Sequence, residues 1–92
     1  MIKSFQHKGL EKFFETGSKA GIQPQHAKRL KEQLGVLNTA VSAKDCDRYG
    51  WFLHPLEKDL AGHWSIRVDP RWRLTFKFEA TDVILLDYQD YH

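Results

Sequence analysis

The sequence has few cysteines, no long apolar run and no histidines at metal-ligand spacing. Cys46 is the only cysteine, which excludes an intramolecular disulfide and a cysteine-based zinc site. The longest apolar run, residues 83–86, is far shorter than the roughly 20 residues that span a bilayer. Residues 1–5 lack the apolar block of a signal peptide, and no two histidines have metal-ligand spacing. We therefore expect a cytoplasmic protein with no metal and no cofactor.

The chain is also short and carries little net charge. Its 92 residues are 41% hydrophobic and 28% charged, which is typical of one globular domain, here residues 1–92. The formal net charge of +2 does not by itself indicate a nucleic-acid-binding protein. Residues 67–77, however, contain Arg67, Arg71, Arg73 and Lys77 against the single acid Asp69. Such a patch suits a weakly bound polyanion, although a solvated charged face is the better explanation of the charge taken alone.

The first half of the chain has helical periodicity. Leu10, Phe13 and Phe14 form one apolar stripe, and Gly17 is placed to end that helix. Pro24 suits the first turn of a second helix. Its apolar positions follow at helical spacing: Ala27, Leu30, Leu34 and Leu37. Residues 2–5 are a short strand candidate, and Ser42 with Asp45 could cap a further short turn.

The second half alternates with the period of a strand. Residues 64–68 and 72–78 alternate apolar and polar side chains, and Asp69-Pro70 between them has the chemistry of a tight turn. Residues 79–82 form a second turn, and residues 83–88 are predicted to be a strand buried on both faces. Short turns require antiparallel pairing. The predicted fold is therefore α+β, with two N-terminal helices packed on a twisted antiparallel sheet.

Period-2 geometry also predicts where the cations project. If the apolar residues of both strands face the helices, then Arg67, Arg73 and Lys77 lie together on the opposite, open face. Cations and hydroxyls on an open sheet face can hold a phosphate backbone. They are equally well explained as the solvent side of a half-buried sheet.

Two further places carry groups suited to proton transfer. Asp90, Tyr91 and His92 follow the last predicted strand directly, and His54 lies in the segment Leu53-His54-Pro55-Leu56. RNA cleavage through the ribose 2′-hydroxyl needs a base, an acid and a cation on the phosphate, which histidine and arginine can supply. No spacing argument brings His54 close to His92, and many inert proteins contain the same residue types.

Several segments in order resemble the HigB toxins of the RelE/ParE toxin–antitoxin superfamily, over essentially the whole chain. The matching segments are residues 2–5, 53–56, 62–68 (Gly-His-Trp-Ser-Ile-Arg-Val), 72–76 (Trp-Arg-Leu-Thr-Phe) and the terminal Asp-Tyr-His, residues 90–92. The resemblance implies a RelE-like fold and a ribosome-dependent endoribonuclease that cuts mRNA in the A site of the 70S ribosome. It also implies a metal-free reaction and a cognate helix-turn-helix antitoxin of the HigA type.

The resemblance further implies a set of site residues. They are the catalytic residues His54, Arg73, Asp90, Tyr91 and His92, and the RNA-binding residues Lys58, Arg67 and Lys77. In this reading Arg73 neutralises the scissile phosphate, while His54 and His92 act as base and acid in an order left open. Some relatives carry a lysine directly after Leu-His-Pro-Leu, where this chain has Glu57 followed by Lys58.

Two alternatives have different consequences. A ParE-like inhibitor of DNA gyrase would share the fold but would not need the proton-transfer groups. A non-catalytic RNA-binding or ribosome-binding module would use only the cationic face, and would leave transcripts intact.

Overall fold

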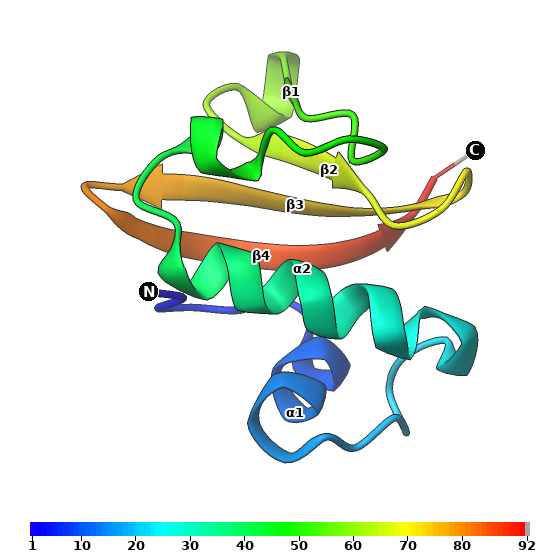
Figure 1. Ribbon diagram of the computed structural model, residues 1–92. Coiled ribbons are helices and arrows are strands. Elements are labelled where there is room, and N and C mark those ends of the chain that lie inside the picture. The colour runs from blue at the N-terminus through cyan, green and yellow to red at the C-terminus, as the bar shows by residue number, and fades with distance from the viewer. Residues whose placement is uncertain (92) are drawn as a thin grey trace.

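The computed structural model describes residues 1–91, which form helices on one side of an antiparallel sheet (Figure 1). The elements along the chain are α1 Lys8–Thr16, η1 Pro24–His26, α2 Ala27–Thr39, η2 Ala43–Cys46, β1 His54–Pro55, η3 Lys58–Leu60, β2 Trp64–Arg67, β3 Trp72–Glu79 and β4 Asp82–Asp90. The strands pair in the order β1-β2-β3-β4, each antiparallel to the next. The predicted α+β class and the two helices over the sheet are confirmed.

The helix ends follow from the residues that the sequence supplies there. Gly17 adopts a left-handed conformation with φ 81°, and its N–H donates to the carbonyl of Phe13, which ends α1. Pro24 opens the 3₁₀ turn η1 that continues directly into α2. Both predictions are confirmed. At η2 the side chain of Ser42 makes no cap, and the carboxylate of Asp45 instead accepts the N–H of Val41, the residue before Ser42, at 2.9 Å.

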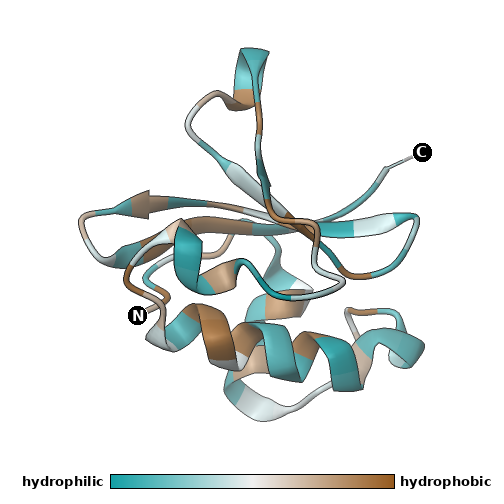
Figure 2. Cartoon of the chain, turned by 45° about the horizontal axis from the view of Figure 1, so that its top comes forward, coloured by the Kyte–Doolittle hydropathy of each residue, from teal (hydrophilic) through white to brown (hydrophobic). Residues whose placement is uncertain are grey.

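The hydrophobic core lies between the helices and one face of the sheet. Figure 2 shows hydrophobic stretches on α2 and along β3 and β4, whereas the C-terminal end of the chain is hydrophilic. The residues with no exposed surface include Leu10, Leu30, Leu37, Ile66, Leu74, Phe76 and Leu86. The alternation predicted for residues 64–68 and 72–78 therefore directs the expected side chains into the core.

Strand β4 departs from the prediction that both of its faces are buried. Val83, Leu86 and Tyr88 are buried, but Ile84 and Leu85 are only partly covered. The cause is a β-bulge, at which Leu85 has φ 56° and the register with β3 shifts. The extra residue resets the alternation, so that residues on both sides of the bulge reach the same core.

The N-terminal segment completes the outer edge of β4. Residues 2–5 do not form a full strand but make two parallel bridges, from Ile2 to Val83 and from Phe5 to Leu86. Ser4 fills the bulge, because its hydroxyl accepts the N–H of Leu85 at 2.8 Å and its carbonyl accepts that of Leu86. The segment thus covers backbone groups that an edge strand would otherwise expose (Figure 1).

Candidate active site

The sheet face turned away from the helices gathers most of the candidate residues. Cross-strand partners point to the same side of a sheet, so the register identifies which side chains share this face. One row across the strands is His54, Ser65, Thr75 and Asp87, and the next row is Arg67, Arg73 and Gln89. Lys77 lies two residues beyond Thr75 on β3 and therefore on the same face. The predicted grouping of Arg67, Arg73 and Lys77 is confirmed.

This open face is more closely packed than the sequence suggested. Ser65 and Thr75 lie on it but are buried, with 1% and 2% of their surface exposed. Arg67, Arg73 and Lys77 are partly buried rather than fully solvated. Long cationic side chains can lie along a sheet and cover shorter neighbours while their charged ends reach water. The face is therefore a shaped polar surface and not a bare one.

Arg73 and Tyr91, both predicted site residues, are in direct contact. The guanidinium carbon of Arg73 lies 4.5 Å from the centre of the Tyr91 ring. Arg73 also donates from Nη2 to Oε1 of Gln89 at 3.4 Å, and its buried Nε has no hydrogen-bond partner within residues 1–91. Tyr91 is held by its backbone N–H, which donates to the carbonyl of Arg71 at 2.7 Å. The pair thus presents a cation that is held against an aromatic ring.

His54 lies on the edge strand β1, exposed to solvent. Its Nδ1 is 2.9 Å from the carbonyl oxygen of Phe52. A carbonyl can only accept, so Nδ1 carries the hydrogen and Nε2 of the neutral ring carries the free lone pair. Nε2 of His54 is therefore able to accept a proton from a bound ligand.

His54 and Arg73 share a face but do not touch. They are separated by two strand spacings and by two residues along the strand. Standard sheet dimensions make this about 12 Å between their Cα atoms. The gap is suited to a ligand that bridges the two side chains.

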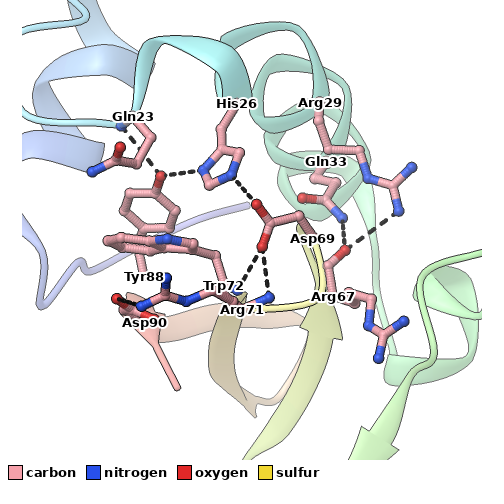
Figure 3. Close-up of polar contacts among 10 residues, drawn as sticks. All are labelled: Gln23, His26, Arg29, Gln33, Arg67, Asp69, Arg71, Trp72, Tyr88 and Asp90. Carbon is pink, nitrogen blue, oxygen red and sulfur yellow. Dashed lines mark hydrogen bonds and ion pairs between the residues drawn. The ribbon is translucent and has the colours of Figure 1, made fainter. Parts of the chain in front are cut away.

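Asp90 is placed differently from Arg73 and Tyr91. Asp90 is the cross-strand partner of Trp72, which places its side chain toward the helix-covered face, away from Arg73. Its Oδ2 lies 3.4 Å from Nη2 of Arg71 (Figure 3). The predicted site residue His92 lies outside the residues that the structure describes.

The two predicted RNA-binding lysines differ in placement, since Lys77 lies on the open face and Lys58 lies in the turn η3. Lys58 is exposed and begins η3, with φ 57°, directly after Glu57. Because Lys58 is in a turn and not a strand, its side chain is not forced to the opposite side from Glu57. Lys77 extends toward the loop at Gly62, where an added Cβ would lie 3.5 Å from the Lys77 Cε.

Three residues on this face were not found from the sequence. Gln89 links the site, because its amide accepts from Arg73 and donates from Nε2 to Oδ2 of Asp87 at 2.9 Å. Asp87 and Gln89 lie four and two residues before Tyr91, so the alternation of a strand predicts that all three side chains share one face. Phe52, whose ring lies 4.5 Å from the Arg67 guanidinium, has no such signal because it lies in an irregular segment.

Beneath the opposite face lies a polar network, buried at His26 and Tyr88 and partly exposed at Asp69, that fixes the neighbouring turn (Figure 3). His26, only 4% exposed, has Nδ1 2.5 Å from the hydroxyl of Tyr88 and Nε2 2.6 Å from Oδ2 of Asp69. The other oxygen of Asp69 accepts the backbone N–H groups of Arg71 and Trp72, both at 2.8 Å. The network thereby holds the turn whose Arg71 carbonyl anchors Tyr91.

The same contacts change the pKa values of two members of this network. Burial by itself would raise the pKa of Asp69, but hydrogen bonds from His26 and from two backbone N–H groups outweigh it and lower the pKa. Burial raises the pKa of Tyr88, and the N–H of Gln23 opposes that change only in part. Asp69 is accordingly a carboxylate, which can only accept, so His26 donates to it from Nε2.

Other chemistry has less support in the described chain. Within residues 1–91 no three His, Cys, Asp or Glu side chains gather where they could hold a metal ion. Burial, with a contribution from Asp45, raises the pKa of the Cys46 thiol to about 11, so it is protonated at neutral pH. No helix in this part of the chain is long and apolar enough to cross a membrane.

Comparison with solved structures shows where this fold occurs. The chain resembles the YoeB–YefM complex from Staphylococcus aureus, with a TM-score of 0.62 and 18% identity over 100% of this chain and 98% of that one. It also resembles YafQ from E. coli strain BL21(DE3), with a TM-score of 0.59 and 16% identity over 98% of this chain and 91% of that one. At these identities the likeness establishes the RelE-like fold alone.

Sequence comparison is more specific. The chain is 44% identical to the Endoribonuclease HigB of Proteus vulgaris over 92 residues, which are 100% of both proteins. Residues 3–92 match the HigB-like toxin family, described as the RelE-like toxin of the type II toxin–antitoxin system HigB. On this evidence the chain belongs to the HigB-like family of type II toxins.

Proposed function

We propose that this toxin is an endoribonuclease that cuts mRNA in the A site of the 70S ribosome. The observation that carries the proposal is the open face, where Nε2 of His54 is free to accept a proton and Arg73 is held ready for a phosphate. The relative that is 44% identical is named an endoribonuclease, which supports the same reaction here.

The reaction needs only groups that the chain itself provides. His54 takes the proton of the ribose 2′-hydroxyl, and the 2′-oxygen attacks the adjacent phosphorus. The bond from phosphorus to the 5′-oxygen breaks, and that oxygen takes a proton from an acid, for which the candidate is His92. The products are a 2′,3′-cyclic phosphate and a 5′-hydroxyl. Arg73 stabilises the charge on the phosphate during this step, because its guanidinium remains protonated and can make two hydrogen bonds to phosphate oxygens.

The remaining candidates take supporting roles. Tyr91 offers its ring to a base, and Lys58, Arg67 and Lys77 contact the RNA backbone. Asp90, which pairs with Arg71, has a positioning role and does not contact the phosphate.

The partners follow from the small net charge and from the family. A protein with a net charge of +2 holds free RNA weakly, so the ribosome supplies the substrate in position. Such a toxin acts in the cytoplasm, where ribosomes translate. As a type II toxin it has an antitoxin partner, and we expect a helix-turn-helix protein of the HigA type.

Primer extension on a reporter mRNA in a reconstituted translation reaction tests this proposal. The wild type should cut within codons when ribosomes are present, and His54→Ala and His92→Gln should each lose about 100-fold or more. Glu15→Gln, an exposed change on α1, is the matched control and should cut like the wild type. Intact message with arrested growth would indicate gyrase inhibition instead, and binding without cleavage would indicate a non-catalytic module. Efficient cutting of naked RNA would contradict the dependence on ribosomes.

A further inference from the structure

We propose that Phe52 and Arg67 form a second nucleotide subsite, in which the Phe52 ring stacks on a base of the mRNA and Arg67 contacts a neighbouring phosphate. This inference rests on the proposed ribonuclease function and deepens it. It adds a base-binding aromatic residue on the β1 side of the open face, at the end opposite Tyr91.

The backbone around Phe52 turns an aromatic ring out into solvent. Phe52 is 61% exposed, whereas its neighbour Trp51 is 2% exposed. Phe52 also has φ 51°, a left-handed conformation that is unfavourable for a bulky residue. Backbone strain of this kind persists only where surrounding contacts enforce it, and it is concentrated at functional sites.

Two hydrogen bonds enforce this conformation. The carbonyl of Trp51 accepts the backbone N–H of Arg67 at 2.7 Å, and the carbonyl of Phe52 accepts Nδ1–H of His54 at 2.9 Å. The segment that presents the ring is therefore tied both to β2 and to the candidate base. A ligand that stacks on Phe52 would lie beside His54.

Arg67 completes the subsite and repeats an arrangement already described. Its guanidinium carbon lies 4.5 Å from the centre of the Phe52 ring, as that of Arg73 does from the Tyr91 ring. Arg67 and Arg73 are direct cross-strand partners on β2 and β3. The open face thus carries two arginine–aromatic pairs side by side, and RNA repeats the matching groups, a base and a phosphate, along its chain.

The pairing of the two arginines favours an anionic ligand over a protein surface. Like charges directly opposite each other on neighbouring strands destabilise a sheet. Two partly buried guanidinium groups in this position become favourable when a phosphate lies near them. An apolar protein partner could cover Phe52, but it would leave this repulsion in place.

Fluorescence on programmed ribosomes tests the subsite. The probe is an mRNA whose A-site codon carries 2′-O-methyl groups, which prevent cleavage, with 2-aminopurine placed at or beside that codon, one position at a time. The wild-type toxin should quench the fluorescence at a position where the base stacks on Phe52. Phe52→Leu should lose this quenching and bind roughly 5- to 150-fold more weakly, whereas Phe52→Tyr should retain both. Tyr49→Ala, a fully exposed aromatic in the same loop region, is the control and should behave like the wild type.

Arg67→Gln provides a second variant, because it keeps the backbone contacts of β2 and removes only the cation. Its binding should depend less on salt, with the slope of log Kd against log salt concentration reduced by about one. The subsite would be overturned if Phe52→Leu left quenching and affinity unchanged, or if Arg67→Gln left the salt slope unchanged. Cleavage by the wild type would in that case still support the proposed nuclease. Loss of antitoxin binding alone would assign Phe52 to a protein interface. A wild type that neither binds programmed ribosomes nor cuts message would overturn the subsite together with the proposed function.

Discussion

Two polar clusters lie on opposite faces of the same strands, and they are organised differently. On the helix-covered face, His26 bonds through both ring nitrogens, to Tyr88 and to Asp69. On the open face, Arg67 and Arg73 stand side by side with like charge, and Nε of Arg73 has no partner within residues 1–91. The groups of the first cluster bond to one another and stabilise the fold, whereas two like charges held side by side are suited to an anionic ligand.

The sharpest test of this difference uses two neighbouring residues of β3 that point to opposite faces. Arg73→Gln should lower cleavage on the ribosome about 100- to 1,000-fold, with little change in the free energy of unfolding. Leu74→Ala should instead lower that free energy by about 2–5 kcal/mol, because Leu74 has no exposed surface, and should still cut where it is folded. Primer extension and urea denaturation measure the two quantities. If Arg73→Gln lowers the free energy of unfolding as much as Leu74→Ala does, the conclusion that the open face serves a ligand and the covered face serves stability is wrong.

A smaller loss of stability is expected when the polar network of His26, Tyr88 and Asp69 is disrupted. His26→Phe keeps a ring in place but leaves the Tyr88 hydroxyl and the Asp69 carboxylate without their partner. The free energy of unfolding should fall by about 1–3 kcal/mol. Gln25→Ala, one residue earlier and exposed, is the matched control for urea denaturation. A His26→Phe protein as stable as the wild type would show that the network contributes nothing net to stability.

The smallest expected effect is the loss of stability at low pH, when Asp69 becomes protonated. Contacts in the folded state lower the pKa of Asp69, so the ionised carboxylate stabilises the folded protein. This stabilisation is fully present at pH values above the pKa of a free aspartate, about 3.9. That contribution should be lost as the pH falls through the lower folded value. Denaturation curves of the wild type and Asp69→Asn between pH 2 and 6 should therefore converge at the acidic end. Parallel curves over that range would contradict the assignment.

Much of the fold could be predicted because buried apolar residues recur at regular spacing, about every 3.6 residues in a helix and every two in a strand. The stripe from Leu10 to Phe13 and the alternation around Leu74 each record which side meets the core. The bulge at Leu85 left no such record, because it depends on Ser4, which lies 81 residues away along the chain. Local pattern can place a side chain on a face, but it cannot supply a distant partner.

The same limit applies to the candidate site. Strand parity placed Arg67 and Arg73 on one face, since that needs only the period of a strand. The contact of Arg73 with Tyr91 and the turning of Asp90 toward Arg71 depend on the register of β3 with β4. Phe52 depends on a left-handed backbone that no residue preference indicates.

The pairing of the N-terminal segment with β4 has a consequence for how the chain folds during synthesis. The hairpins of β2, β3 and β4 join neighbouring segments, so each can form as soon as its two strands have been made, but Ser4 meets Leu85 only across 81 residues of chain. Closing so large a loop is entropically costly and slow compared with local contacts. The nascent polypeptide therefore lacks its finished edge until β4 has been made. This edge of the toxin is consequently completed only after translation has passed Leu85.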